Sequence, residues 1–325
     1  MKAAVVENKK MVITEVDEPV LKAGEALVEV YATALNRADL LQKQGTYPSP
    51  QGWPAWPGLE LSGKIVEMKE GDTPCPFKVG DKVCALVGGG AYAEKIAVPY
   101  TLLMPVPNNI KMEEAASLPE AYATSYLNLF IEGKLEKGQT LYVAAGASGL
   151  ASAAIPMGKA AGAKVITSVQ TKAQAEKIKA LGADYIIVQE IESIPSVFRR
   201  LEEEGTPVNV CMDCLGGEDL GEALSFMARG GYWVLISTLA GVETTVKLRP
   251  VLTKGLHLVG SMLRNRTNEM KAEILNGLVE KTWRHLESGT MKPSVYKVFP
   301  FEEVNEAHAV LERFENTGKV VLKIK

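Results

Sequence analysis

The stretch Thr140-Leu-Tyr-Val-Ala-Ala-Gly-Ala-Ser-Gly-Leu-Ala-Ser-Ala-Ala-Ile155 decides how this chain of 325 residues folds. It starts as a buried β-strand, turns through the small residues Gly146, Ala147, Ser148 and Gly149, and continues from Leu150 as a helix. Small side chains let the backbone approach a pyrophosphate, and the helix start offers free N–H groups and a positive dipole. A further strand opens about twenty residues past the turn, so the segment predicts a dinucleotide-binding unit.

Other interpretations of this region are weaker. Close packing of a helix on a sheet also explains a turn of small residues, and Pro156 should bend the helix beyond its first turn. The turn resembles a nucleophile elbow, but Leu150 stands where that motif needs glycine. Cys211-Met-Asp-Cys214 has the spacing of a redox pair, yet it lies at the end of a predicted strand without a thioredoxin-like context.

The next predicted strand indicates which dinucleotide binds. An NAD site needs Asp or Glu about twenty residues past the turn, to bind the ribose 2′-hydroxyl. Lys164-Val-Ile-Thr-Ser-Val-Gln-Thr-Lys172 contains no acid, whereas Ser168, Thr171 and Lys172 suit a 2′-phosphate. The same residues could also cap the following helix, and the two roles are compatible. The sequence therefore favours NADPH over NADH.

The composition excludes several classes of protein. A formal charge of −3 with scattered basic residues argues against a nucleic-acid groove or an anionic membrane as the main partner. Four cysteines and three histidines are too few for a disulfide scaffold or a multi-metal protein. The N-terminus has no apolar stretch typical of a secretion signal, and no apolar segment reaches the ~18 residues of a membrane span. We expect a cytoplasmic protein with reduced thiols.

The strand and helix signals change character along the chain. Short strands with turn residues between them dominate the first hundred residues and suggest a compact barrel-like β domain. A helix starts near Leu118-Pro119-Glu120, after which strands and helices alternate, which predicts a doubly wound parallel sheet. Six strands are expected in this part, at 140–145, 164–169, 184–188, 208–213, 232–237 and 256–260. A long helix at about 268–287, a strand near 295–299, a helix from 302 to about 314 and a strand at 319–324 complete the chain.

A proline- and tryptophan-rich segment lies between Gly45 and Gly58. It contains four prolines together with Tyr47, Trp53 and Trp56. It could be an exposed connector, but three large aromatic rings in so short a stretch favour a loop anchored on a surface or over a cleft.

Motifs spread over the whole chain resemble one family. They include Asn36-Arg-Ala-Asp39, Pro57-Gly-Leu-Glu-Leu-Ser-Gly63, Gly90-Ala-Tyr-Ala-Glu94, Leu118-Pro-Glu-Ala-Tyr-Ala-Thr-Ser-Tyr126 and Gly260-Ser-Met-Leu-Arg264. In order and spacing the chain resembles the NADPH-dependent, zinc-independent quinone oxidoreductases (zeta-crystallin-like) of the medium-chain dehydrogenase/reductase superfamily. The resemblance implies an α/β fold, with a Rossmann domain at 121–266 inserted into a GroES-like β-barrel catalytic domain at 1–120 and 267–325.

The resemblance also implies roles for single residues. Thr124 would lie near the nicotinamide, while Leu239, Leu263 and Arg264 would border the cofactor. Asn36 and Tyr47 would be nearest the substrate, and we assign to them the hydrogen bonds to the developing oxyanion. Their alternative role is ordinary loop and strand pairing. His308 could donate a proton, but on an amphipathic helix it is more often a packing residue.

The zinc ligands of related alcohol dehydrogenases are missing. Asn36 stands where those enzymes carry cysteine, and Leu59 where they carry histidine. A catalytic zinc needs three protein donors, so a metal-free reaction is expected. An electron-poor quinone can accept a hydride without a Lewis acid, which makes quinone reduction our main hypothesis. The alternatives are reduction of α,β-unsaturated ketones or aldehydes, and an NADPH-binding sensor or scaffold with little turnover. The expected assembly is a homodimer.

Overall fold

The structure is a computed structural model that describes residues 1–72 and 74–325. The chain divides into two compact units, Met1–Ala123 with Arg264–Lys325, and Thr124–Leu263. The second unit is therefore inserted in the sequence of the first. The boundaries expected from the sequence, 120 and 267, each differ from the observed division by three residues.

The inserted unit contains a six-stranded parallel sheet, as the alternating pattern predicted. Its strands are β8 (Thr140–Val143), β9 (Lys164–Val169), β10 (Tyr185–Val188), β11 (Val210–Asp213), β12 (Tyr232–Leu235) and β13 (His257–Gly260). In space their order is β10-β9-β8-β11-β12-β13. Numbered within the unit this is 3-2-1-4-5-6, the arrangement of dinucleotide-binding sheets.

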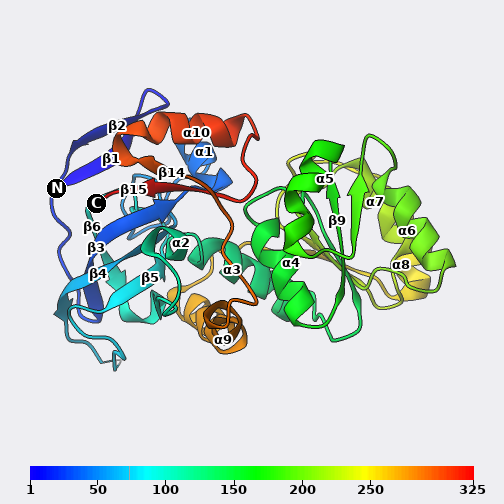
Figure 1. The fold of residues 1–325 in the computed structure, drawn as a ribbon, viewed down its shortest axis with the longest axis horizontal. Helices are drawn as coiled ribbons and strands as arrows, with labels where there is room; N and C mark the ends of the chain where they lie inside the picture. The colour runs from blue at the N-terminus through cyan, green and yellow to red at the C-terminus, as the bar shows by residue number, and fades with distance from the viewer. Residues whose placement is uncertain (73) are drawn as a thin grey trace. The chain divides into compact units, whose positions relative to one another are not determined.

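Helices lie on both sides of this sheet (Figure 1). They are α4 (Ala151–Ala160), α5 (Lys172–Ile178), α6 (Ile194–Glu203), α7 (Glu218–Ala223) and α8 (Leu248–Lys254). One core joins the rings of Tyr142, Phe198 and Trp233, with Tyr142 and Phe198 edge to face at 5.2 Å. A smaller cluster of Val169, Ala175 and Ile178 packs α5 against the sheet. The central strands β8 and β11 are thus buried on both faces, as is typical of parallel sheets, whereas β13 at the edge is largely exposed.

The outer unit is built on a seven-stranded sheet and a separate hairpin. Its strands are β1 (Lys2–Glu7), β2 (Lys10–Glu15), β3 (Glu25–Ala34), β4 (Glu60–Lys69), β5 (Lys82–Leu86), β6 (Lys95–Pro99), β7 (Leu103–Pro105), β14 (Val295–Pro300) and β15 (Lys319–Lys323). Strand β3 pairs with β4, β6 and β15, and two bulges interrupt its register with β4. Because bulges bend and twist a strand, β3 can pair with β6 near its start and with β15 near its end.

In the described part of the outer unit, α-helices accompany these strands. They are α1 (Arg37–Gln44), α2 (Met112–Ala115), α3 (Pro119–Tyr126), α9 (Asn268–Glu287) and α10 (Val304–Glu312). The division between the units falls within α3. Helix α10 lies beside the β1–β2 hairpin (Figure 1), with which it shares a core.

Some boundaries differ from the sequence predictions. The helix expected to start near Leu118-Pro119-Glu120 begins at Pro119 and is α to Tyr126, after which residues Leu127–Glu132 form a π-helix. Helix α4 runs through Pro156 without interruption, so its first turn is intact. The β1–β2 hairpin was not predicted; its turn places Asn8 and Lys9 at positive φ, a conformation that Asn tolerates well. None of the helices in the described residues is long and apolar enough to cross a bilayer.

His308 is a core residue of the outer unit, in agreement with the packing role favoured by its sequence context. It is completely buried on α10, and its ring meets Tyr92 edge to face at 5.8 Å. Neither ring nitrogen has a hydrogen-bond partner among the described residues. Burial, aided by the charge of Lys43, lowers the pKa of His308 to about 3.

This burial predicts an acid-dependent loss of stability. Because the folded-state pKa of His308 lies below its ordinary value of 6.5, the unfolded chain binds the proton first, and stability falls as the pH drops through 6.5. Between about pH 7 and pH 5 the site should contribute a loss of about 2 kcal/mol. Urea unfolding of wild type and His308→Leu at both pH values measures this difference. Equal pH dependence of the two proteins would contradict the prediction.

Candidate functional site

The turn between β8 and α4 has a backbone that only small residues permit. Ala145 adopts a positive φ of 53°, and the amide of Gly146 donates to the Ser168 carbonyl at 2.7 Å. A Cβ on Gly146 would lie 2.5 Å from the Thr167 hydroxyl oxygen and 2.9 Å from Ile178. The glycine is therefore required where the turn passes between β9 and α5.

Beyond this glycine the turn leaves backbone donors free. The N–H groups of Ala147, Gly149 and Leu150 have no acceptor in the described part of the chain. Ser148 instead closes the helix start, because its hydroxyl accepts from the Ala151 amide at 3.1 Å. Three free N–H groups at the positive end of α4 are suited to the oxygens of a phosphate. Each of the three residues is only half-buried, so the donors are accessible.

The polar residues after β9 have different roles in the structure. Ser168 is 1 % exposed and its hydroxyl bonds to that of Tyr142 at 2.7 Å, so it is not available to a 2′-phosphate. Thr171 caps α5 by accepting from the Gln174 amide at 3.3 Å. Lys172 is exposed, and among the described residues its ammonium has no ion-pair partner. Its amide, however, donates to the Glu190 carboxylate at 2.9 Å.

The remaining residues expected to border the cofactor lie on several different elements. Thr124 is half-buried on α3, Leu239 is 48 % exposed after β12, and Leu263 is buried after β13. Arg264 belongs to the outer unit, where it contacts Tyr47. Its guanidinium is used within the outer unit, so only the backbone of Arg264 is left for the expected contact with the cofactor, which stays a prediction.

The guanidinium of Arg264 joins three segments of the outer unit. Its Nε donates to the Gly88 carbonyl at 3.0 Å, Nη1 to the Tyr47 carbonyl at 3.1 Å, and Nη2 to Gln42 Oε1 at 2.7 Å. It also lies 4.6 Å from the centre of the Tyr47 ring. Burial raises the pKa of Tyr47, the Arg264 charge lowers it, and the charge of Glu120 raises it again.

Asn36 is part of a buried ionic network. Its Nδ2 donates to Glu60 Oε1 at 2.9 Å and to the Ala34 carbonyl at 3.3 Å, and its Oδ1 accepts from Lys319 Nζ at 2.7 Å. Lys319 and Glu60 form an ion pair at 2.6 Å, with side chains 6 % and 0 % exposed. The hydrogens of the Asn36 amide are therefore used within the chain, so it has no free N–H for a substrate oxygen. We withdraw the role of Asn36 as an oxyanion donor.

Two further carboxyl groups lie in this region. Glu60 Oε2 accepts from the Glu120 amide at 2.9 Å, at the start of α3. Burial and the charge of Glu60 raise the pKa of the Glu120 side chain to about 7. Burial likewise raises the pKa of Asp39 to about 6, although Asp39 accepts from the amides of Asn36 and Gly58. The outer unit thus has carboxyl groups that exchange protons near neutral pH.

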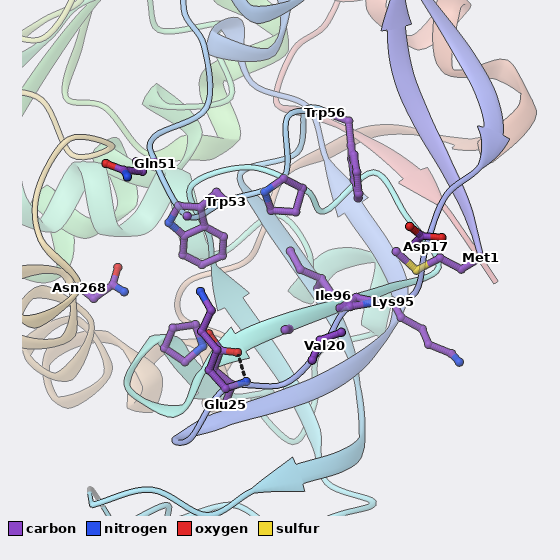
Figure 2. Close-up of a pocket in the computed structure, with 16 residues that line it drawn as sticks. Met1, Asp17, Val20, Glu25, Gln51, Trp53, Trp56, Lys95, Ile96 and Asn268 are labelled. Atoms are coloured by element: carbon purple, nitrogen blue, oxygen red, sulfur yellow. Dashed lines mark hydrogen bonds between the residues drawn. The ribbon is translucent and has the colours of Figure 1, made fainter.

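The tryptophan-containing loop is anchored on the outer unit. The Trp56 indole N–H donates to the Gly90 carbonyl at 2.9 Å, and a Cβ on Gly88 would lie 2.5 Å from the Trp53 ring. Figure 2 shows both indoles at a pocket with Val20 and Ile96. The pocket has a volume of about 410 Å³. Two acidic and two basic side chains line it, Asp17, Glu25, Lys22 and Lys95, so its charges balance.

No three His, Cys, Asp or Glu side chains among residues 1–72 and 74–325 are grouped so that they could hold a metal ion. Sequence reasoning missed Gln42, Lys319 and the network around Glu60. A signal was present, since Lys319 directly precedes the apolar run Val-Val-Leu at 320–322. A lysine buried in a strand requires an anionic partner.

Comparisons with known proteins agree with this architecture. The family model "Alcohol dehydrogenase GroES-like domain" matches residues 22–108, and the model "Zinc-binding dehydrogenase" matches residues 149–279. A quinone oxidoreductase-like protein 2 homolog of Nematostella vectensis is 31 % identical over 309 residues, or 94 % of this chain and 83 % of the relative. Quinone oxidoreductase-like protein 2 of Bos taurus is 29 % identical over 98 % of this chain and 90 % of the relative.

Among solved structures, the quinone oxidoreductase of Thermus thermophilus, studied alone and with NADPH, is 26 % identical. It superposes with a TM-score of 0.83, covering the full length of both chains. The sheet order, the phosphate-binding turn and a relative above 30 % identity point to one family. The chain belongs to the quinone oxidoreductase branch of the medium-chain dehydrogenase/reductase superfamily.

Proposed function

We propose that this protein is an NADPH-dependent reductase that delivers a hydride to a quinone. The observation that carries the proposal is the set of three free N–H groups, on Ala147, Gly149 and Leu150, at the start of α4 in a 3-2-1-4-5-6 sheet. The relatives named quinone oxidoreductase-like and the Thermus structure with NADPH support the acceptor and the cofactor.

The residues of the inserted unit fit an NADPH pyrophosphate and 2′-phosphate. The free amides would hold the pyrophosphate, and the exposed Lys172 ammonium, with the Thr171 hydroxyl beside it, would hold the 2′-phosphate. The nearby Glu190 carboxylate opposes this preference, because it repels a phosphate. We therefore place the selectivity mainly on Lys172. Bound NADPH supplies the hydride.

In the outer unit, Tyr47 is the donor that we assign to the acceptor oxygen. Its raised pKa keeps the phenol protonated at neutral pH, so it can donate a hydrogen bond to the oxygen that gains charge. Asn36 acts differently, because its amide holds Glu60 and Lys319 in place.

The donor set at Asn36 does not fit a catalytic zinc. An amide, a carboxylate and an ammonium meet there, and the Lys319 ammonium already balances the charge of Glu60. A zinc ion would meet the repulsion of this ammonium and lack thiolate or imidazole ligands. We propose that the reaction uses no zinc, which favours acceptors that are electron-poor before they bind.

We also propose a homodimer that forms through the exposed edge of the inserted unit's sheet. Four large apolar side chains are exposed in the segment that follows β12 and ends with β13: Val242 82 %, Leu248 76 %, Leu252 83 % and Leu258 52 %. Leu258 lies on the edge strand β13, which pairs only with β12 among the described strands. Pairing of two β13 strands would cover these side chains and the free edge.

The reaction itself is tested by measuring NADPH oxidation with a panel of quinones and enones. Faster turnover of naphthoquinones than of enones supports the proposal. Preference for enones assigns the alternative reductase activity, and NADPH binding without turnover on either class assigns a sensor or scaffold. Metal analysis of the active protein is the matched control, since stoichiometric zinc would contradict the metal-free reaction.

Removal of the Lys172 ammonium should weaken the binding of NADPH but not that of NADH. We expect Lys172→Ala to raise the Kd of NADPH about tenfold and to leave that of NADH unchanged, since the lost bond is charge-assisted. Fluorescence titration with both cofactors measures this. Lys177→Ala, on the same helix, is the control for a general loss of positive charge. If the Kd of both cofactors rose equally, Lys172 would not be a ligand of the 2′-phosphate.

Removal of the Tyr47 hydroxyl should slow hydride transfer. We expect Tyr47→Phe to lower kcat/KM for the quinone about tenfold, because one hydrogen bond to a charged oxygen is lost. The Kd of NADPH should not change. A loss of less than about twofold, a few tenths of a kcal/mol, would exclude Tyr47 as a donor.

A charge on the exposed apolar edge should prevent dimerisation. We expect Leu252→Glu to elute at monomer size in gel filtration, because burial of the carboxylate against the partner would be unfavourable. Val20→Glu, at a side chain that is 85 % exposed on the outer unit, should leave the elution volume unchanged. Elution of the unmodified protein as a monomer would contradict the proposed dimer.

A further inference from the structure

We propose that Arg264 is a positioning residue for Tyr47, fixing both its backbone and the orientation of its ring. This inference rests on the proposed function, in which Tyr47 donates to the acceptor oxygen. It gives Arg264 a role in catalysis that the sequence did not suggest, because the sequence placed this residue beside the cofactor.

The first support is the geometry of the guanidinium. Its Nε, Nη1 and Nη2 donate to three different segments, at Gly88, Tyr47 and Gln42. The side chain is only 5 % exposed, so these bonds do not compete with water. A planar fork of donors is specific to arginine, and a lysine ammonium could not reach all three acceptors in these directions.

The second support is that Arg264 holds Tyr47 at two points. Nη1 binds the Tyr47 carbonyl at 3.1 Å, while the guanidinium carbon lies 4.6 Å from the ring centre. A cation at this distance is attracted to the face of an aromatic ring. Backbone and ring are thus fixed by the same group, which reduces the ordering needed when an acceptor binds.

The third support is the rest of the loop. Gln42, which accepts from Arg264, donates its Nε2 to the Ser49 hydroxyl at 2.9 Å and to the Ala55 carbonyl at 2.8 Å. On Gly89 a Cβ would lie 2.4 Å from the Ser49 hydroxyl, and on Gly90 it would lie 2.6 Å from Pro54. The loop therefore packs directly on the backbone of residues 88–90, which carry no side chains, and its conformation is preformed.

The charge of Arg264 also acts on the proton of Tyr47. In the proposed reaction the quinone would gain one hydride, with its hydrogen and two electrons, from bound NADPH and would thereby be reduced. The Tyr47 O–H bond would break as its proton forms the O–H bond of the hydroquinone. A proton from solvent would then restore the phenol, so that the quinone takes up one hydride and one proton in all. A guanidinium over the ring stabilises this phenolate, against the burial and the Glu120 charge that disfavour it. Asp39 and Glu120 in turn interact with Arg264, and Arg264 acts on Lys271.

Two variants of Arg264 and one of Gln42 test the proposal. Arg264→Gln removes the charge and the fork, Arg264→Lys keeps the charge alone, and Gln42→Met removes loop anchors without changing charge. The Tyr47 phenol is titrated in each protein by ultraviolet difference spectroscopy, with a Tyr47→Phe version of the same protein subtracted. This readout needs no substrate. The pH profile of kcat/KM for a naphthoquinone is measured in parallel, and thermal unfolding confirms that each variant is folded.

We expect Arg264→Gln to lower kcat/KM about tenfold or more and to move both the phenol titration and the alkaline limb of the profile to higher pH. Arg264→Lys and Gln42→Met should lower kcat/KM with little change in the titration. An unmoved titration in Arg264→Gln, or an equal shift in Gln42→Met, would overturn the proposal. If Arg264→Gln does not fold, a titration in Arg264→Lys shifted to higher pH overturns it and an unshifted one supports it.

A titration that shifts while Tyr47→Phe retains full activity would separate the two proposals. In that case Arg264 controls the proton affinity of Tyr47, but the phenol is not the donor to the acceptor.

Discussion

The free N–H groups at the start of α4 are the constraint from which the function of the inserted unit follows. A helix start with unpaired donors is unfavourable when buried without a partner, and in most helices side chains or water satisfy it. Here the Ser148 hydroxyl accepts from the amide of Ala151 and its carbonyl from that of Ser152, whereas three neighbouring amides have no acceptor among the described residues. An anion that binds all three amides gains several bonds at once in a half-buried site. This arrangement is held by the order of the strands, by Gly146, which packs against β9 and α5, and by the uninterrupted first turn of α4.

In the outer unit the main electrostatic constraint is the burial of the Glu60 carboxylate. Glu60 is fully buried, and it is stabilised by the Lys319 ammonium, the Asn36 amide and the Glu120 backbone N–H. Burial and the charge of Glu60 together raise the pKa of the neighbouring Glu120 side chain. The positive charge beside Glu60 comes from the Lys319 ammonium, which lies 2.6 Å from the carboxylate and balances its charge.

The sequence predicted those parts of the molecule that depend on local pattern. Helix α9 matches its predicted range of 268–287, and β9 matches 164–169, because amphipathic spacing and β-branched runs are properties of short segments. The parallel sheet followed from the alternation of elements. The networks could not be predicted, since Lys319 is 259 residues away from Glu60 and Arg264 is 217 residues away from Tyr47. Ser168 was misjudged for the same reason, because its partner Tyr142 lies on the neighbouring strand.

The glycine triplet Gly88-Gly89-Gly90 connects these observations. The triplet is typical of a tight turn, but in the structure its main role is to let a loop pack closely against its backbone. Trp53, Ser49 and Pro54 each lie where a side chain on one of the three glycines would be. The absence of these side chains lets the loop that carries Tyr47 pack directly on the backbone, and Arg264 then binds the carbonyls of Gly88 and Tyr47 together. In the proposed reaction, where Tyr47 donates one hydrogen bond to the acceptor oxygen, a loop held in this way reduces the ordering needed for that bond. The orientation of that bond then matters more than the strength of any single contact.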